Sequence, residues 1–269
     1  SLATVTFPSL TPTGGSPAIA RQFVTPDETN ADAAARLLIG GANGLYESLD
    51  QGSTVFRVTS ASVNSFEGGN SMAYGGFLNG VPNPDVLYIA SGTDVLVRTT
   101  AGGPVSITPS DPTSARITSV ELNDQDWRNA FVITLGAVFS TPDTGATWSN
   151  ITGDILTEGA FDLRSLEFID LPSFVDFDLL LVGAGNGVYF ARTDSLTQWT
   201  EMGGDTLPNV PVWDMHYDVV DDLLVVGTLG RGAWSIPNFS TPFLPEPATV
   251  TALAGAMCLG TLRPRRTRR

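Results

Sequence analysis

One short pattern returns five times along this chain, and it constrains the fold more than any other feature of the sequence. Each copy is a turn followed by a run that predicts a β-strand. The copies are separated by roughly 40 to 50 residues, a period typical of repeat architectures. They are Gly44–Ser48, Asp94–Arg98, Gly136–Ser140, Gly187–Ala191 and Gly232–Ile236. The chain is therefore predicted to consist of repeated sheet units.

Further strands are predicted on both sides of these copies. An apolar or β-branched run precedes each copy, at Leu37–Gly40, Val86–Ala90, Phe131–Leu135, Leu179–Val182 and Leu223–Gly227. Another strand follows four of the copies, at Phe56–Thr59, Val105–Thr108, Trp148–Thr152 and Trp199–Met202. An inner strand opens each unit, as at Ile117–Leu122. Four strands at this period predict an all-β chain, a β-propeller with five blade units visible.

The five units begin near Ala18, Met72, Ile117, Leu163 and Val212, and the last has no fourth strand of its own. The segment Thr4–Phe7 is a candidate for that strand, which would close the ring, but it fits equally well in an upstream blade. The chain begins with Ser1 and shows no signal-peptide pattern. We therefore expect a fragment of a larger propeller from which a presequence and one or two blades are missing.

Composition supports this fold and excludes some functions. With 28 Gly, 18 Pro and 16% charged residues, the chain suits short strands and tight turns, and 42% hydrophobic residues provide a core. Residues 1–239 contain nine Arg against 27 Asp and Glu, a balance that repels nucleic acid and anionic lipid. The single cysteine, Cys258, lies near the C-terminus, so residues 1–239 can form neither a disulfide nor a thiolate metal site.

A turn between the third and fourth strands of one unit carries the most specific motif in the body. Its residues follow the spacing Ser/Thr-x-Asp-x-Gly-x-Thr-Trp and are Thr141, Asp143, Gly145, Thr147 and Trp148. This spacing resembles the Asp-box, or BNR repeat. A related copy contains Ser48, Asp50 and Gly52, with Val55 in place of the aromatic residue, and a more divergent copy spans 193–199.

The chemistry of this motif is local. We expect Asp143 to accept hydrogen bonds from amides of its own turn, Gly145 to adopt a positive φ and Trp148 to pack against the sheet. Families that carry the motif include sialidases, sortilin-like receptors, photosystem assembly factors and some glucanases. In them it lies at the periphery of the blade, away from the active site. The resemblance thus implies a propeller and a structural role for these residues.

The C-terminus has a different character. A linker follows Phe239, and then come Pro245, Glu246 and Pro247, fifteen uncharged residues at 248–262, and a basic end with Arg263, Arg265, Arg266, Arg268 and Arg269. This order resembles a PEP-CTERM sorting signal, the tag of exosortase-type transpeptidases in Gram-negative bacteria. The apolar part is shorter than the roughly 20 residues of a stable membrane span, which predicts transient membrane contact with the Arg cluster on the cytoplasmic side.

The sequence therefore divides into a propeller at 1–239, a linker with the Pro-Glu-Pro motif at 240–247, and a sorting tail at 248–269. No catalytic, cofactor-binding or metal-binding residue is predicted. The only histidine, His216, has no partner in the sequence pattern for a catalytic triad. Asp218, Asp221 and Asp222 form an acidic turn without the spacing of an EF-hand, which favours a solvated hairpin over a calcium site.

Three functions are compatible with these patterns. The first is an exported, non-catalytic binding or scaffold protein of the cell envelope or extracellular matrix, with an exosortase-type enzyme and a polysaccharide or surface protein as partners. The second is a glycoside hydrolase of the sialidase or glucanase kind, although no Arg lies in a recognisable sialidase context. The third is an envelope assembly factor, for which the acidic body would favour a basic protein partner.

Overall fold

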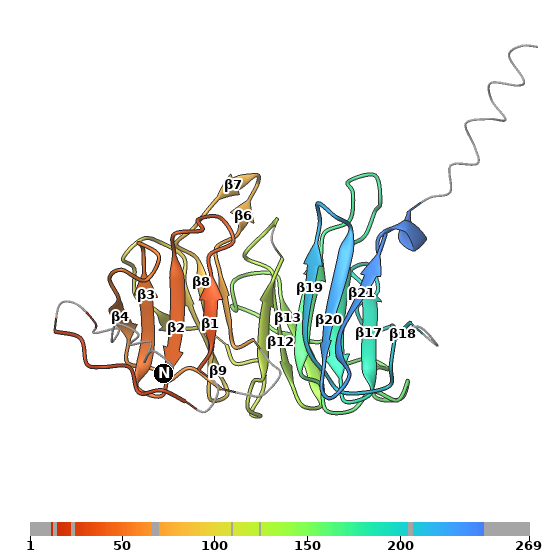
Figure 1. The fold of residues 1–269 in the computed structure, drawn as a ribbon, viewed down its shortest axis with the longest axis horizontal. Coiled ribbons are helices and arrows are strands. Elements are labelled where there is room, and N and C mark those ends of the chain that lie inside the picture. Colours follow the sequence, from red (N-terminus) through yellow and green to blue (C-terminus); the bar gives the residue numbers. More distant parts are fainter. Residues whose placement is uncertain are drawn as a thin grey trace, which may run out of the picture.

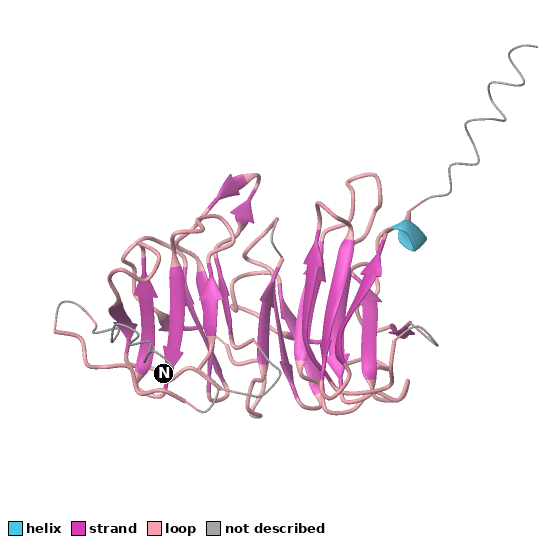
Figure 2. Cartoon of the chain, in the orientation of Figure 1, coloured by secondary structure: helices cyan, strands magenta, loops and turns pink. Residues whose placement is uncertain are grey.

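The computed structural model describes residues 12, 15–22, 25–65, 70–108, 110–123, 125–203 and 207–244. These residues form strands and turns, with one 3-10 helix, η1 (Thr241–Phe243), after the last strand (Figure 2). Five main sheets stand side by side with their strands along a common direction (Figure 1). The prediction of an all-β chain is confirmed.

Consecutive strands are antiparallel and adjacent in four sheets, with an interruption in the second. The first sheet contains β1 (Asp27–Thr29), β2 (Leu37–Gly41), β3 (Gly44–Ser48) and β4 (Phe56–Thr59). The second contains β5 (Met72–Tyr74), β8 (Leu87–Ser91), β9 (Asp94–Arg98) and β10 (Ser106–Ile107), and the hairpin β6 (Phe77–Leu78) to β7 (Val81–Pro82) lies between β5 and β8 in the chain. The third contains β11 (Ser119–Leu122), β12 (Ala130–Thr134), β13 (Ala137–Thr141) and β14 (Ser149–Asn150).

The last two sheets follow the same order. The fourth contains β15 (Ser165–Ile169), β16 (Leu179–Ala184), β17 (Gly187–Arg192) and β18 (Trp199–Met202). The fifth has three strands, β19 (Val212–Asp218), β20 (Leu223–Thr228) and β21 (Gly232–Pro237). These bounds agree closely with the predicted second, third and fourth strands. The segment Thr4–Phe7, predicted as a possible closing strand, lies outside the described residues.

The start of the first unit was predicted wrongly. Its first strand is β1, and the residues near Ala18 lie against the first sheet without joining it. The Tyr46 hydroxyl donates to the Pro17 carbonyl at 2.9 Å, and the Asn43 side-chain amide donates to the Ala18 carbonyl at 2.8 Å. Ile19 packs against Tyr46 on the outer face of this sheet. The apolar residues that suggested a strand instead cover an otherwise exposed sheet face.

Apolar layers join each sheet to the next. On β8, Leu87 and Ile89 pack toward the first sheet, whereas Tyr88 and Ala90 pack toward the third. β16 divides its side chains in the same way between the third and fifth sheets. Because the inner sheets are buried on both faces, their strands read as continuous apolar runs. Burying one such side chain contributes about 2 kcal/mol, so these layers are the main source of stability.

The first strands of the five sheets, β1, β5, β11, β15 and β19, lie next to one another in that order. We call them the inner strands. The connections from each inner strand to the following strand lie at the end of the array where the β6–β7 hairpin projects, at the top of Figure 1. This arrangement brings side chains together that are about fifty residues apart in the chain.

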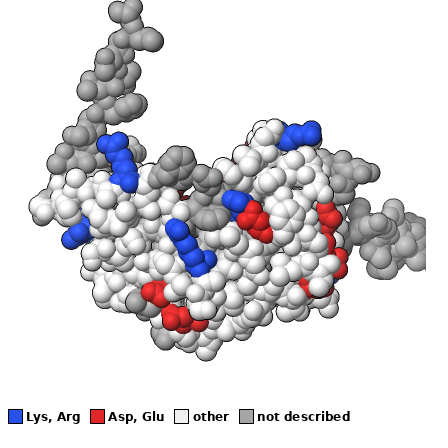
Figure 3. Space-filling model, turned by 90° about the horizontal axis from the view of Figure 1, so that it is seen from below, with Lys and Arg blue, Asp and Glu red and all other residues white. Residues whose placement is uncertain are grey.

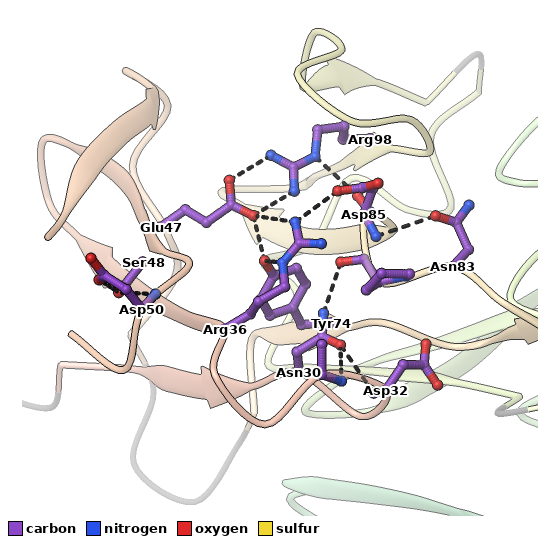
Figure 4. A network of polar contacts seen from close by, with 12 residues as sticks. Asn30, Asp32, Arg36, Glu47, Ser48, Asp50, Tyr74, Asn83, Asp85 and Arg98 are labelled. Carbon is purple, nitrogen blue, oxygen red and sulfur yellow. Dashed lines mark hydrogen bonds and ion pairs between the residues drawn. The ribbon is translucent and has the colours of Figure 1, made fainter. Parts of the chain in front are cut away.

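A buried ion network connects the first and second sheets (Figure 4). Arg98 on β9 donates from Nη1 and Nη2 to the Oε2 and Oε1 atoms of Glu47 on β3, at 2.9 and 2.7 Å, and both side chains are 3% exposed. Arg36 Nη2 lies 3.1 Å from Glu47 Oε1 and 2.7 Å from Asp85 Oδ1. The Tyr74 hydroxyl donates to Glu47 and accepts from Arg36 Nε at 2.8 Å. Both carboxylate oxygens of Glu47 are therefore hydrogen-bonded.

The network decides the ionisation of Glu47. Burial would by itself raise the pKa of this carboxyl group, but hydrogen bonds from Arg98 and Tyr74, the Arg98 charge and the hydrogen bond from Arg36 outweigh it, so the pKa lies below its ordinary value. Glu47 is consequently an anion held by two guanidinium groups. A buried carboxylate of this kind is stable only while its partners are in place.

Candidate functional site

The inner strands line a cleft of about 800 Å³. Its walls come mainly from β1, β11, β15 and β19, with the loop residues that follow them. Six lining residues are carboxylic acids, and none of the described lining residues is Lys or Arg. The six are Asp27, Glu28, Glu121, Glu167, Asp170 and Asp214. We call this feature the acidic cleft.

The described charged side chains that line the cleft, His216 apart, are all acidic. At the opposite end of the array from the β6–β7 hairpin, charged side chains of both signs are scattered over a mostly uncharged surface (Figure 3). An excess of one sign within a concave, partly desolvated site produces a stronger local potential than the same charges on an open surface. The cleft is therefore the strongest candidate for a ligand site on the described part of the chain.

Glu28 is the most perturbed acid of the cleft. Burial, together with repulsion from Asp27 and Asp214, raises its pKa to about 7, although the Asn70 side-chain amide donates a hydrogen bond to Glu28 Oε2 at 2.5 Å that opposes the rise. Burial also raises the pKa of Asp214, whose Oδ1 accepts a hydrogen bond from the Met215 amide at 3.0 Å. Two acids of the cleft therefore have pKa values above their ordinary range.

Glu167 has a different environment. Its Oε1 atom accepts a hydrogen bond from the Tyr217 amide at 2.6 Å, which links β15 to β19. The same oxygen lies 3.9 Å from Nδ1 of His216, whose side chain is 79% exposed. His216 is therefore a solvent-facing strand residue beside a carboxylate. Among the described residues its surroundings contain no serine or cysteine hydrogen-bonded to it, as a nucleophile–histidine pair would require.

Aromatic side chains in the cleft already pack against other groups. Phe168 stacks on Phe131 with ring centroids 5.6 Å apart. The Arg164 guanidinium lies over the Trp213 ring at 5.6 Å from its centroid. The Tyr217 ring contacts Phe239 at 5.6 Å, and its hydroxyl donates to Asp222 at 2.9 Å. Each of these three rings therefore already has a packing partner within the protein.

Glu28→Gln is expected to change the pH dependence of stability. The pKa of folded Glu28 is raised from 4.5 to about 7, so the folded state holds the proton of this group more tightly than the unfolded state does. The contribution of protonated Glu28 to the stability of the fold is therefore complete below pH 4.5 and is lost as the pH rises through 7. The neutral amide cannot ionise, so the variant should be more stable than the parent by about 1 to 2 kcal/mol above neutral pH. Urea unfolding across this pH range measures the difference.

Glu158→Gln, at an exposed position outside the cleft, provides a comparison for Glu28→Gln at matched net charge and should change stability little. A stability difference between the Glu28 variant and the parent that stays constant from acid to alkaline pH would contradict the assignment of a raised pKa. The expected difference in the free energy of unfolding grows only between pH 4.5 and about 7, the ordinary pKa of Glu28 and its pKa in the folded chain.

The two motif turns predicted from the sequence have the same hydrogen bonds. In the first, Gly52 donates its amide to Ser48 Oγ at 2.8 Å, and Asp50 accepts from the Thr54 amide and hydroxyl, both at 2.7 Å. Gly52 has φ +83°, a conformation that side chains disfavour. Ser48 Oγ in turn donates to Asp50 Oδ1 at 3.0 Å. The polar side chains of this turn therefore form their hydrogen bonds within the turn.

The second turn repeats this geometry on β13. Gly145 donates its amide to Thr141 Oγ1 at 2.9 Å, and Asp143 accepts from the amide and the hydroxyl of Thr147, both at 2.8 Å. Thr141 Oγ1 also donates to Asp143 at 2.9 Å. The Trp148 ring packs against the apolar layer between the second and third sheets. None of these residues lines the acidic cleft, and their hydrogen bonds give them local structural roles.

Thr141→Val should lower the free energy of unfolding by about 1 to 2 kcal/mol, because it leaves the buried Gly145 amide without its acceptor while preserving side-chain shape. Thr200→Val, at an exposed position of β18, is the matched control and should have little effect. Equal destabilisation by the two variants in urea titrations would show that the hydroxyl of Thr141 does not support the turn.

The divergent third copy uses a carboxylate from elsewhere in the chain. Asp154, which follows the third sheet, accepts a hydrogen bond from the Trp199 amide at 2.7 Å. Trp199 is 3% exposed, and its indole donates to the Ile151 carbonyl at 3.1 Å. The connection after β14 therefore holds the start of β18, which joins the third and fourth sheets.

In the predicted acidic turn at 218–222, two of the carboxylates accept hydrogen bonds from neighbouring segments of the chain. Asp218 Oδ1 accepts from the amides of Val220 and Asp221 at 2.8 and 3.1 Å. Asp222 accepts from the Ser240 amide at 2.8 Å and from its hydroxyl at 3.1 Å. Within the described residues, no group of three or more His, Cys, Asp or Glu side chains is arranged to hold a metal ion.

The predicted sorting residues, Pro245, Glu246, Pro247, Arg263, Arg265, Arg266, Arg268 and Arg269, lie outside the described residues. Within the described part of the chain, no helix is both long and apolar enough to cross a bilayer.

The sequence prediction missed the acidic cleft, although the repeat contains a signal for it. Glu121 and Glu167 occupy the third position of the corresponding inner strands β11 and β15. Aligning the units and reading down one column would have placed these two acids in neighbouring positions. Considered one at a time among 28 acidic residues, they do not stand out.

Comparison with solved structures identifies the fold. An ancestral GH74 enzyme matches with a TM-score of 0.57 and 15% identity over 81% of this chain. This chain covers only 31% of the GH74 enzyme, about a third of its length. The β-propeller domain of Cps50 (Swd1) from Myceliophteria thermophila matches with a TM-score of 0.55 and 12% identity, covering 86% of this chain and 70% of that domain.

No protein-family model matches the sequence, and neither does any curated protein. At 12 to 15% identity the structural matches establish the type of fold alone. Together with the side-by-side sheets, they show that the chain has a β-propeller fold.

Proposed function

We propose that this chain is part of an exported propeller of the bacterial cell envelope or extracellular matrix, and that it binds a ligand in the acidic cleft without transforming it. The observation that carries the proposal is the gathering of six acids, and no described Lys or Arg, on the walls of one cleft. Ligand sites are concave and contain a few convergent polar groups, and this cleft lies where inner strands and their connecting loops converge.

In this proposal the five sheets are blades of a larger ring. The fifth sheet supports this view, because β21 is mostly exposed and carries the partly exposed Trp234. A further strand or blade would cover this surface. The turns at Ser48–Gly52 and Thr141–Trp148 are, in the same proposal, Asp-box turns that close individual blades.

Export is proposed from the C-terminal sequence. The Pro245-Glu246-Pro247 motif, the uncharged segment and the terminal Arg cluster have the order of a substrate for an exosortase-type enzyme. Expression of the chain behind an added secretory signal peptide, with and without residues 245–269, in a host that has the sorting enzyme, tests the role of the tail. The chain with residues 245–269 should become anchored in the envelope, and the shortened chain should be exported without being anchored. The same distribution of the two chains between the envelope and the soluble fractions would refute sorting by the tail.

Binding is tested separately from location. The purified chain and an Asp27→Asn, Asp214→Asn variant are compared for binding to envelope polysaccharides and to basic peptides by calorimetry. A cleft ligand should bind the parent and bind the variant more weakly, because two negative charges have been removed. Equal binding by both proteins would place the ligand elsewhere.

Glycoside hydrolysis is the second candidate function, favoured by one observation. Glu28, with a pKa of about 7, lies near Asp27 and Asp214, and a carboxyl group with a raised pKa beside a second carboxyl group is the pairing that glycoside hydrolysis uses. Incubation of the complete chain with β-glucans and sialylated glycans tests it. Release of reducing sugar that Glu28→Gln abolishes would establish an enzyme and overturn the non-catalytic proposal.

A further inference from the structure

Exposed apolar side chains lie at the mouth of the acidic cleft. Val219 and Val220, in the connection from β19 to β20, are 70% and 88% exposed, and Phe174, in the connection from β15 to β16, is 64% exposed. Because β15 and β19 are neighbouring inner strands, these two connections project together at one end of the array (Figure 1). We call these three residues the apolar rim.

The rim and the cleft form one continuous surface. Val219 is itself a lining residue of the cleft, and Asp170 begins the connection that carries Phe174. Single exposed apolar residues need no explanation, but a group of them beside a concave site marks an interaction surface. The connection around Val219 and Val220 is held in place by Asp218, which accepts hydrogen bonds from the amides of Val220 and Asp221.

Two features of this surface select the class of partner. The exposed acids Asp27 and Asp214 favour a cationic ligand over a neutral glycan. A small inorganic cation would satisfy the charge but would make no use of the apolar rim. The aromatic rings of the cleft, which a sugar would require for stacking, already contact Phe131, Arg164 and Phe239.

We infer that the acidic cleft and the apolar rim together bind a basic amphipathic segment of a partner protein, with Lys or Arg side chains in the cleft and apolar side chains on Phe174, Val219 and Val220. The inference rests on the proposed binding function and names the chemistry of its ligand. A segment with its basic and apolar residues in separate stretches suits the site, because the rim adjoins the cleft at Val219 and the two stretches can contact them side by side.

Defined peptides test the inference with the 269-residue chain. The probe is an eight-residue peptide of four Lys followed by four Leu, compared by calorimetry with Lys-Ser and Glu-Leu peptides of the same length and design. The Lys-Leu peptide should bind at least about tenfold more tightly than Lys-Ser, and Glu-Leu should not bind. Binding should weaken as salt is added, because the charges of the peptide and the cleft are screened.

Substitutions test the apolar rim and the acidic cleft separately. Val219→Ser with Val220→Ser should reduce Lys-Leu affinity to that of Lys-Ser, whereas Val81→Ser, at the exposed β6–β7 hairpin, should leave it unchanged. Asp27→Asn with Asp214→Asn should weaken both Lys peptides about fivefold. Asp27→Asn alone, at an exposed position of β1, gives a smaller effect in the same direction if the double variant unfolds.

Several outcomes overturn the inference. Equal binding of Lys-Leu and Glu-Leu, or Lys-Leu binding that the cleft variants do not change, excludes the proposed surface. Binding only after the five Arg residues at 263–269 are replaced by Gln would identify the chain's own C-terminus as the occupant. If an envelope polysaccharide binds in a manner sensitive to Asp27 and Asp214 while the peptides do not, the binding function stands and the partner class is wrong.

Discussion

Replacing Arg98 by Met is expected to lower the free energy of unfolding by about 3 kcal/mol or more. The substitution removes two charge-assisted hydrogen bonds from Glu47, a side chain that is 3% exposed. Arg36 and Tyr74 remain in contact with the carboxylate, but one guanidinium group then has to compensate both Glu47 and Asp85. Urea unfolding at neutral pH, followed by tryptophan fluorescence, measures the loss.

The control for this experiment is an exposed pair. Arg128 also forms an ion pair with a carboxylate, Asp126, but its side chain is 47% exposed, so Arg128→Met should leave stability nearly unchanged. The double variant Glu47→Leu, Arg98→Met should be less destabilised than the single Arg98→Met variant, because it leaves no uncompensated anion. A single variant as stable as the parent would show that the network does not hold the first two sheets together.

The network also predicts a sensitivity to acid. Since the pKa of folded Glu47 lies below the ordinary value of 4.5, its contribution to stability is complete above pH 4.5 and is lost as the pH falls through the lower folded value. Arg98→Met removes the strongest of the interactions that lower this pKa. The stability difference between parent and variant should therefore shrink at acid pH, which the same urea titrations detect.

The sequence predicts strands better than it predicts contacts between them. The repeated turn-and-strand pattern locates β3, β9, β13, β17 and β21 because apolar side chains of these strands pack against other sheets and recur at one position of each unit. The short β6–β7 hairpin escapes detection because Phe77–Pro82 has no comparable apolar run and no counterpart in the other units. The start of the first unit is misjudged because a covering segment and a strand can contain the same apolar residues.

The candidate site, unlike the strands, could not be located from the sequence. Its acids are polar residues on inner strands, where a single sequence gives no reason to prefer one carboxylate over another. What brings them together is the packing of successive inner strands, so Glu121 and Glu167 become neighbours only once the units are aligned. The raised pKa of Glu28 likewise depends on Asp214, which is far along the chain on β19. The composition predicts an acidic protein, but only the packing of the sheets shows that six of its acids line one cleft.

Gly153→Ala is expected to be among the most damaging single changes in the chain, with a loss of about 3 kcal/mol. Gly153 has φ +51°, and a Cβ atom added there would lie 2.0 Å from the Thr197 carbonyl oxygen and 2.5 Å from its carbon. Both are backbone atoms, so no rotamer change can relieve the contact. The turn would have to move away from the strand that it supports.

That movement would break the junction between the third and fourth sheets. The Asp154 amide donates to the Thr197 carbonyl at 3.2 Å, and Asp154 Oδ1 accepts from the Trp199 amide. Gly52→Ala is the matched control, because Gly52 also has a positive φ but an added Cβ there would meet no atom within 4 Å. Gly52→Ala should lower the free energy of unfolding by only about 1 kcal/mol, because alanine disfavours a positive φ. Equal losses at the two glycines in urea titrations would mean that strain, and not the close approach of the two sheets, explains why glycine is needed at position 153.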